Sequence, residues 1–492
     1  MKKWWPVLVG CAAAAAGTAA AVFYAHAGLT LSHFDARAHV VVARRILDSL
    51  TPGWQQIGAV WLPLPHLLQM VPVQVDGWYR SGAAGVAISV ASTGVAAGAL
   101  ARLILISTGS MIGGATGAAL LLANPNLLYI QSTPMTEPLL LATAFLSLAA
   151  LADWIDRGAE EWPHAAGLAL TATVMTRYEG WLIAAAAIAI AAAVLLRRGS
   201  TLPGAMRAAV RLSAYPAAAI AIFSANSRWT IGTWMIPSGF FVPENEALGN
   251  ASLAWEQVRL SVYRLSGTAS VWPAYAGTAL VALAFIASRR RAPIALVLAL
   301  LAAGVLPWYA YLQGHPLRVR YGLLLVAACA ALTAAGVGLL WRALRPIAAI
   351  VVVAAVLSQT RPLDRGALLI AESQRDAANA AGRAAVTAYL LEHYNAARGD
   401  GPIMMSMGSL AHYMHDLGRA GFDIHSFLHE GNGQAWQYAV LGPKGYVQWV
   451  VIEERAEGGD SLYQAFKRDE RYLNGFERVA EGGGVALYRA VQ

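Results

Sequence analysis

An apolar run and a polar octapeptide near the N-terminus decide the fold of this chain: WPVLVGCAAAAAGTAAAVFY (residues 5–24) and SHFDARAH (residues 32–39). The first has the length of a helix that crosses a bilayer, about 20 residues. The second opens a long loop, residues 28–82, that precedes the next apolar run. Loops between helices are usually short, and ionisable groups beside a membrane are rare unless they have a role or a partner. Asp35 is therefore the first candidate functional residue.

The composition indicates a polytopic membrane protein. Of the 492 residues, 57% are hydrophobic and only 13% are charged, and the mean hydropathy is +0.49. Soluble domains carry about 25% charged residues. The formal net charge is +8, but the basic residues form short clusters between apolar runs, as the positive-inside rule expects. We therefore expect membrane lipids as partners and no nucleic acid.

The apolar runs predict about eleven transmembrane helices. They cover residues 5–24, 85–106, 111–130, 138–154, 164–175, 181–196, 212–227, 273–288, 293–312, 317–341 and 347–357.

The positive charges orient these spans. Lys2 and Lys3 favour a cytoplasmic N-terminus, and the later arginine clusters at 197–198 and 289–291 then fall on the same side. Ala25-His26-Ala27 is similar to a signal-peptide cleavage site, but the apolar run before it is long and favours an uncleaved span. We expect an integral protein of the cytoplasmic (inner) membrane.

The chain becomes more polar after about residue 361. Residues 372–393, 408–417 and 461–467 are predicted as helices, and residues 403–406, 447–453 and 485–489 as strands. This alternation predicts a small α/β domain. The expected domains are therefore 1–360, a transmembrane domain with the long first outer loop 28–82, and 361–492, a soluble extracytoplasmic α/β domain. A role of this domain in binding an acceptor is left open.

The unusual polar residues gather at the predicted outer ends of the spans. They are Asp35 and His39 after the first span, Glu137 at the fourth, Arg177, Tyr178 and Glu179 between the fifth and sixth, and Arg318, Arg320 and Tyr321 at the tenth. Carboxylates and arginines from distant parts of the sequence thus share one membrane face. Such convergence is expected of a site at the outer membrane boundary.

In these features the sequence resembles the GT-C class of membrane glycosyltransferases, especially the family-39-like branch of protein O-mannosyltransferases and the lipid A aminoarabinose transferase. The resemblance rests on Asp35, on the loop containing WLPLPH (residues 61–66), on the pair Arg320-Tyr321 and on the polar C-terminal part. It covers the whole membrane half. Relatives often carry two adjacent acidic residues in the first loop, whereas Asp35 has no acidic neighbour. The resemblance implies a GT-C-like fold and a polyprenyl-phosphate-linked sugar donor from the cell envelope.

The chemistry of such a donor suits these residue types. Displacement at the anomeric carbon needs a carboxylate that takes the proton of the acceptor and cations that hold the departing phosphate. We predict Asp35 as the base and Arg320, with Arg318, as the phosphate-binding residues. The predicted substrate-binding residues are His39, Trp61, His66, Glu137, Arg177, Tyr178, Glu179 and Tyr321.

The predicted enzyme is a hexosyl- or pentosyltransferase, similar to a mannosyltransferase. A single displacement inverts the anomeric configuration, by analogy with glycosidases. The acceptor is a lipid, a glycan or a protein. No metal site is predicted, because His33, His39 and His66 lack the close spacing of metal ligands, but a divalent metal stays open as a cofactor.

Structural interpretations compete with these roles. Ser32 and Asp35 match a capping box for a helix over residues 36–50, and Glu137 is typical of the first turn of a helix, where the dipole favours an acid. Arg177 and Glu179 form a structural pair at a span end in this interpretation, and Arg318 is a solvated flanking residue.

Two other functions compete with the enzyme. One is a transporter or flippase of a lipid-linked or anionic substrate, and the other is an interaction protein anchored by its membrane part. A transporter typically has internal repeats and polar or broken helices near mid-membrane. We find neither pattern, since segments such as 184–193 are apolar throughout.

Overall fold

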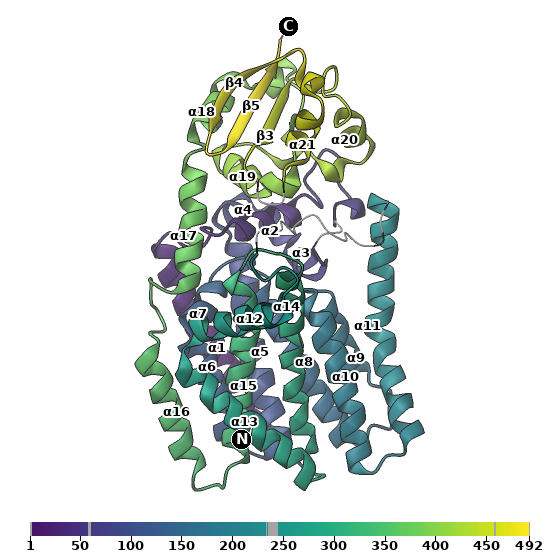
Figure 1. Ribbon diagram of the computed structural model, residues 1–492, viewed down its shortest axis with the longest axis vertical. Helices are drawn as coiled ribbons and strands as arrows, with labels where there is room; N and C mark the ends of the chain where they lie inside the picture. Colours follow the sequence, from purple (N-terminus) through teal and green to yellow (C-terminus); the bar gives the residue numbers. More distant parts are fainter. Residues whose placement is uncertain (1, 58–60, 233, 235–244, 457–458, 492) are drawn as a thin grey trace. The chain divides into compact units, whose positions relative to one another are not determined.

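A computed structural model describes residues 2–57, 61–232, 234, 245–456 and 459–491. The chain forms two compact units, which Figure 1 shows in one ribbon diagram. The first unit comprises Met1–Ala27, Val86–Ala225 and Pro243–Ile370, and the second comprises Gly28–Gly85, Asn226–Val242 and Ala371–Gln492. The first is almost entirely helical, and the second combines short helices with a sheet.

Apolar helices build the first unit. They are α1 (Trp5–His26), α5 (Ala83–Thr108), α6 (Met111–Ala123), α7 (Pro125–Ile130), α8 (Glu137–Asp156), α9 (His164–Val174), α10 (Glu179–Arg198), α11 (Leu202–Ile231), α12 (Ala251–Ser266), α13 (Thr268–Ala287), η3 (Ala292–Gly304), α14 (Val305–Leu312), η4 (Val319–Gly322), α15 (Leu323–Leu339) and α16 (Arg345–Gln359). Within the described residues, 8 helical segments are long and apolar enough to cross a membrane, and α6, α9 and α16 are shorter apolar helices. Together they correspond to the predicted spans. The chain is an integral membrane protein with a polytopic helical fold.

The third predicted span is broken rather than continuous. Pro125 lacks the backbone N–H that would continue α6 and instead begins α7, where proline is well tolerated. The Asn124 side chain caps α7 by accepting the N–H groups of Asn126 and Leu127 at 3.0 and 3.1 Å. Both asparagines also donate to the carbonyl oxygen of Leu265 in α12. The break is therefore held by buried hydrogen bonds.

Helix α15 forms the centre of the first unit. In the segment Val319–Leu339, 94% of the residues in the most apolar window are buried. Small residues let the neighbouring helices approach closely, as is common in membrane bundles. A Cβ atom added at Gly277 of α13 would overlap the Leu332 carbonyl oxygen of α15, and one at Gly113 of α6 would lie 2.9 Å from the Ala334 carbonyl oxygen.

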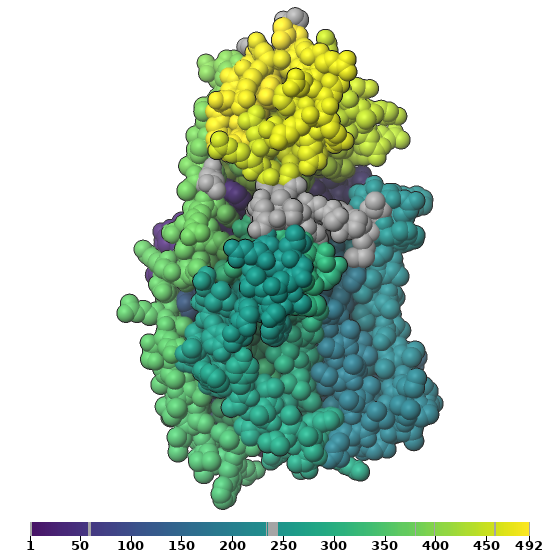
Figure 2. Space-filling model, in the orientation of Figure 1, coloured from purple at the N-terminus to yellow at the C-terminus, as the bar shows by residue number. Residues whose placement is uncertain are grey.

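The outer helices of this unit expose apolar side chains. Val210 and Ile222 of α11 are 69% and 71% exposed, and Leu283 and Ile286 of α13 are 60% and 66% exposed. Figure 2 shows both helices at the surface, α11 in blue-teal and α13 in teal. The hydrocarbon core of a lipid bilayer explains such apolar faces, because a soluble protein rarely exposes large apolar patches.

The second unit contains short helices and a five-stranded sheet. Its elements from the first loop are α2 (Phe34–Arg44), η1 (Trp54–Ile57), α3 (Leu64–Gln69), η2 (Pro72–Gln74) and α4 (Asp76–Ser81). Those from the C-terminal part are α17 (Leu368–Ala381), α18 (Ala384–His393), η5 (Ala396–Arg398), β1 (Ile403–Met405), α19 (Met407–Ala420), η6 (Ile424–Ser426), β2 (Phe427–Leu428), η7 (Glu430–Asn432), α20 (Gln434–Ala439), β3 (Trp449–Glu453), α21 (Ser461–Arg468), η8 (Glu470–Leu473), β4 (Phe476–Gly482) and β5 (Val485–Ala490).

The sheet has the strand order β2-β1-β3-β5-β4. Strands β1, β2 and β3 are parallel, and β5 pairs antiparallel with both β3 and β4. Alternate residues face two separate cores, as the two-residue period of a strand requires. Trp449 and Val451 pack with α18 and α19, whereas Val450 and Ile452 pack with α20 and α21. Figure 1 shows these helix pairs on either side of the sheet. The predicted α/β character is confirmed.

The first loop packs with the C-terminal segment. The side chains of Val40 and Val41 in α2 are fully buried in the same core as Leu410 and Met414 of α19. We expected this loop to belong with residues 1–360, whereas contacts group it with Ala371–Gln492. The physical reason is that α2 carries a Val40-Val41-Val42 run that finds its apolar partners on α19.

Some local predictions differ from the structure. The helix expected over 372–393 is interrupted between Ala381 and Ala384, and α20, β2 and β4 were not predicted. Helix α2 spans Phe34–Arg44 rather than 36–50, and its capping residue is His33 rather than Ser32. The Ser32 hydroxyl instead donates to the Gly28 carbonyl oxygen at 3.4 Å.

Candidate active site

Four of the predicted site residues meet in the first unit. Arg177 lies between two carboxylates, with Nη1 3.3 Å from Glu137 Oε1 and Nη2 2.9 Å from Glu179 Oε1. Arg320 Nε lies 3.4 Å from the same Glu137 oxygen. The sequence-based expectation that these residues converge is thus fulfilled in space. We call Glu137, Arg177, Glu179 and Arg320 the charged cluster.

Helix ends position the charged cluster. Glu137 is the first residue of α8, Glu179 is the first residue of α10, and Arg320 lies in η4 directly before α15. The N-terminal ends of helices carry partial positive charge, which favours an acid there and also favours an anion. The arrangement therefore places two acids where helix dipoles stabilise them and two arginines beside these acids.

The turn between α9 and α10 requires a glycine. A Cβ atom added at Gly180 would overlap the carbonyl oxygen of Thr173, so only glycine lets the two helices approach this closely. The indole of Trp181 donates to the Val174 carbonyl oxygen at 2.8 Å and closes the same turn. Arg177, within this turn, also donates to the Thr136 hydroxyl at 2.9 Å. Gly180 and Thr136 are thus part of the site, although sequence reasoning did not single them out.

Burial makes the ion pairs of the charged cluster strongly coupled. The Glu137 side chain is 3% exposed and that of Arg320 is 10% exposed. Burial alone lowers the pKa of Arg177, but the adjacent Glu137 and Glu179 carboxylates raise it, and the net pKa is raised. A carboxylate held between two arginines is a poor proton acceptor, because the charged form is the stabilised one. Glu137 therefore suits a structural or positioning role better than that of a base.

Tyr311, His315 and Tyr321 make contacts around the segment that carries Arg318 and Arg320. The Tyr311 hydroxyl donates to the Arg318 carbonyl oxygen at 2.7 Å, and the rings of Tyr311 and Tyr321 stack with centroids 6.5 Å apart. The Tyr321 hydroxyl lies 3.4 Å from His315 Nε2. These contacts fix the backbone at the two predicted phosphate-binding arginines.

Tyr178 differs from its neighbours in the predicted motif. Its ring packs edge-on against Trp181, with centroids 5.4 Å apart. This contact is part of the α9–α10 turn. Of the three residues 177–179, the arginine and the glutamate make the ion pairs.

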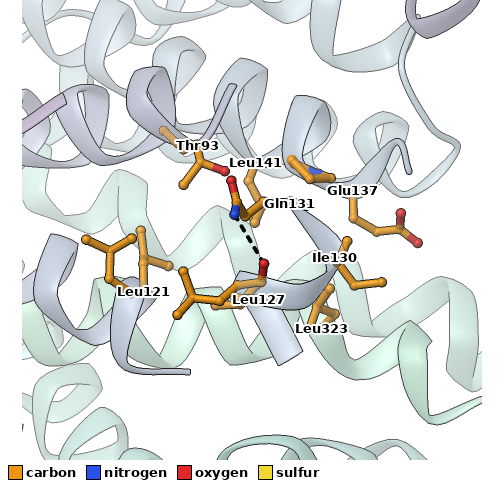
Figure 3. Close-up of a pocket in the computed structure, with 12 residues that line it drawn as sticks. Thr93, Leu121, Leu127, Ile130, Gln131, Glu137, Leu141 and Leu323 are labelled. Atoms are coloured by element: carbon orange, nitrogen blue, oxygen red, sulfur yellow. Dashed lines mark hydrogen bonds between the residues drawn. The ribbon is translucent and has the colours of Figure 1, made fainter. Parts of the chain in front are cut away.

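A small cavity adjoins Glu137 in the first unit. Its volume is about 30 Å³, room for roughly one water molecule. The lining is apolar except for Thr93, Gln131 and Glu137, and Figure 3 shows these side chains around it. The Gln131 amide is held by the Leu128 carbonyl oxygen at 3.2 Å. The cavity is therefore lined mainly by apolar side chains and by one carboxylate, and it is too small for a sugar.

Asp35 lies in the first turn of α2, in the second unit. Its backbone N–H donates to His33 Nδ1 at 3.2 Å, so the histidine caps the helix. Asp35 is a half-buried residue, whereas the residues that follow it in α2 are buried. It is therefore more exposed than most of the helix that carries it.

Three further predicted residues form an aromatic group in the second unit. His39 Nδ1 lies 3.0 Å from His66 Nε2, and Trp61 packs on His39 with ring centroids 4.1 Å apart. Burial, then the charges of His39 and Arg45, hold the pKa of His66 well below its usual value. The ring of His66 is therefore neutral at physiological pH.

The described residues contain no group of three or more His, Cys, Asp or Glu side chains arranged to hold a metal ion. His33 serves as a helix cap, while His39 pairs with His66. Two of the three histidines of the first loop thus contact each other, and the third caps α2.

Comparison with known proteins identifies the fold. No protein-family model matches this sequence, and no curated protein matches it. Among solved structures, the crystal structure of ArnT from Cupriavidus metallidurans in the apo state is similar to this chain, with a TM-score of 0.60 and 12% sequence identity. The similarity covers 96% of this chain and 96% of that chain. The chain therefore shares the fold of ArnT, and the expected helical membrane part with a C-terminal α/β domain is confirmed.

Proposed function

We propose that this chain, which shares the fold of ArnT over 96% of its length, is a glycosyltransferase of the GT-C kind. It transfers a sugar from a polyprenyl-phosphate donor to an acceptor on the outer face of the cytoplasmic membrane. The observation that carries the proposal is the charged cluster, because within this fold it gathers two arginines beside acids at the N-terminal ends of α8 and α10. A lipid, a glycan or a protein is the acceptor.

Arg320 and Arg318 hold the phosphate of the donor in this proposal. The two glutamates of the charged cluster pair with two arginines, Arg177 and Arg320, and Arg318 lies two residues before Arg320 in the sequence. An arginine has five N–H donors in a planar fork, so one guanidinium can bind more than one anionic oxygen. Arginine also matches phosphate oxygens in a planar, two-pronged geometry.

Asp35 accepts the proton of the acceptor in the proposed reaction. The acceptor hydroxyl oxygen forms a bond to the anomeric carbon, and the bond between that carbon and the phosphate oxygen breaks. The electron pair of that bond leaves with the polyprenyl phosphate, which Arg320 and Arg318 stabilise. A single displacement of this kind inverts the anomeric configuration. Asp35 is partly exposed, whereas Glu137 is buried and paired with two arginines. Asp35 therefore suits the role of proton acceptor better than Glu137 does.

Label transfer tests the proposal. The purified protein in lipid nanodiscs is incubated with radiolabelled polyprenyl-phosphate sugars and a membrane extract that supplies acceptors. Label that moves from the donor to a chemically distinct product supports the transferase. No product with any donor, combined with movement of the intact donor across reconstituted vesicles, would make the protein a transporter instead.

A further inference from the structure

The helix that carries Asp35 is held at its first turn by the C-terminal part of the chain. Both segments lie in the second unit. The backbone N–H of Phe34, one of the helix N-terminal donors that lack a partner within the helix, donates to Asp376 Oδ2 of α17 at 3.2 Å. The neighbouring N–H of Asp35 donates to His33. One of the two caps at this turn thus comes from a distant segment.

The ring of Phe34 is held by the C-terminal segment as well. It stacks on His412 of α19, with centroids 4.1 Å apart and planes 21° apart. Arg383 lies over the same ring at 5.8 Å and contacts His412 Nε2. Arg383 also pairs with Glu453 of β3. The Phe34 ring is therefore connected through His412 and Arg383 to the sheet.

His412 is suited to this contact because it is neutral. Burial, then the charges of Arg383 and Arg37, hold the pKa of His412 well below its usual value. A neutral imidazole can accept from Arg383 and still stack on Phe34.

We propose that Asp376 and His412 are positioning residues that fix the Phe34–Asp35 turn and thereby hold the Asp35 carboxylate in place for proton transfer. This inference rests on the proposed function of Asp35. It assigns the C-terminal α/β domain a part in catalysis without contact to the reacting atoms. A misplacement of a catalytic group by about 1 Å can reduce a rate by about 100-fold.

The first test compares Asp376→Ala with Asp376→Asn and Asp469→Ala. Asp469 is the matched control because its carboxylate also accepts a backbone N–H, that of Arg471 at 3.0 Å, but at the start of η8. Asp376→Ala is expected to lower kcat by at least tenfold with little change in KM for the donor, because the donor is held elsewhere. Asp376→Asn retains an acceptor oxygen and is expected to restore most of kcat. Equal kcat values for Asp376→Ala and Asp469→Ala would overturn the inference.

A second readout does not depend on activity. Hydrogen exchange of a peptide that spans residues 33–37 is expected to speed up at least tenfold in Asp376→Ala and in His412→Ala, but to stay unchanged in Asp469→Ala. Unchanged exchange in all three variants would overturn the inference even if the wild type proves inactive. Failure of the proposed function looks different, because the wild type then transfers no label while exchange still responds to Asp376→Ala.

Discussion

Arg320 Nε lies 3.4 Å from Glu137 Oε1, and this contact joins the start of η4 to the start of α8. Arg177 reaches the same glutamate oxygen from the α9–α10 turn. One carboxylate thus fixes two arginines that come from distant parts of the sequence. Buried charges are rarely kept in a membrane protein without a function, and here they lie at three helix ends rather than within apolar segments.

Arg177→Ala tests whether the charged cluster is held together by its central arginine. The substitution leaves Glu137 and Glu179 buried without this partner, which costs about 3–5 kcal/mol when a buried pair is broken. We expect a clear fall in the midpoint of thermal unfolding in detergent. Arg207→Ala, at an exposed position of α11, serves as the control and should leave the midpoint unchanged. Equal midpoints for the two variants would show that the ion pairs contribute nothing to stability.

Arg320→Ala tests the phosphate-binding role. Hydrogen bonds to charged groups contribute about 1.5–3 kcal/mol each, so donor affinity should fall by at least tenfold. Arg320→Lys retains the charge but not the planar fork and should recover part of the affinity. The measurement is binding of a labelled polyprenyl-phosphate sugar to protein in nanodiscs. Wild-type affinity in a folded Arg320→Ala variant would remove this residue from the role.

Much of the first unit could be predicted from the sequence, because apolar runs of sufficient length form spans almost regardless of their surroundings. Glu137, Arg177 and Arg320 were predictable as neighbours because the alternation of spans places their ends on one face. The break before Pro125 also has a local pattern, an asparagine followed by a proline, although the apolar run alone predicts one continuous span.

The second unit was less predictable. Nothing near Phe34 in the sequence indicates that its partners are Asp376 and His412, since contacts between distant segments leave no local pattern. The capping role of His33 was missed for a local reason. Ser32 fits the usual capping preference, but its hydroxyl is bonded to Gly28. Gly180 is ordinary in sequence, and only the approach of the Thr173 carbonyl shows why it is needed.

Gly180→Ala tests the close approach in the α9–α10 turn. The added Cβ would overlap the Thr173 carbonyl oxygen, and such overpacking typically costs about 1–3 kcal/mol. The control is Gly77→Ala in α4, where an added Cβ meets nothing within 4 Å; this change should be neutral or slightly stabilising. Thermal unfolding of both variants gives the comparison. A stable Gly180→Ala variant with full activity would contradict the geometry described for this turn.

The second unit should lose stability on acidification. Burial holds the pKa of His66, His412 and His429 well below the usual value, and it lowers the pKa of His415 to about 3. Below about pH 6.5 the unfolded chain therefore binds more protons than the folded one, so the free energy of unfolding falls as the pH falls. Each such group contributes a slope of about 1.4 kcal/mol per pH unit.

Glu453 should oppose this trend. Burial raises the pKa of Glu453 to about 7, although Arg383 acts in the other direction. Its folded form binds more protons than the unfolded form between about pH 4.5 and 7, so its contribution to stability falls as the pH rises. Hydrogen exchange of the β1 and β3 peptides between pH 4 and 8 measures the combined contribution of the histidines and Glu453 to the free energy of unfolding. Net stabilisation on acidification would contradict the neutral histidines, and His415→Gln should reduce the slope.

Transfer of label by Asp35→Asn, measured beside the wild type, tests the central claim most directly. Asparagine has nearly the same shape but cannot take a proton, and a general base contributes about 100- to 10,000-fold to a rate. The account predicts that the wild type forms glycosylated product and that a folded Asp35→Asn variant forms it at least 100-fold more slowly, with donor binding retained. Product formation by Asp35→Asn at the wild-type rate would contradict the account.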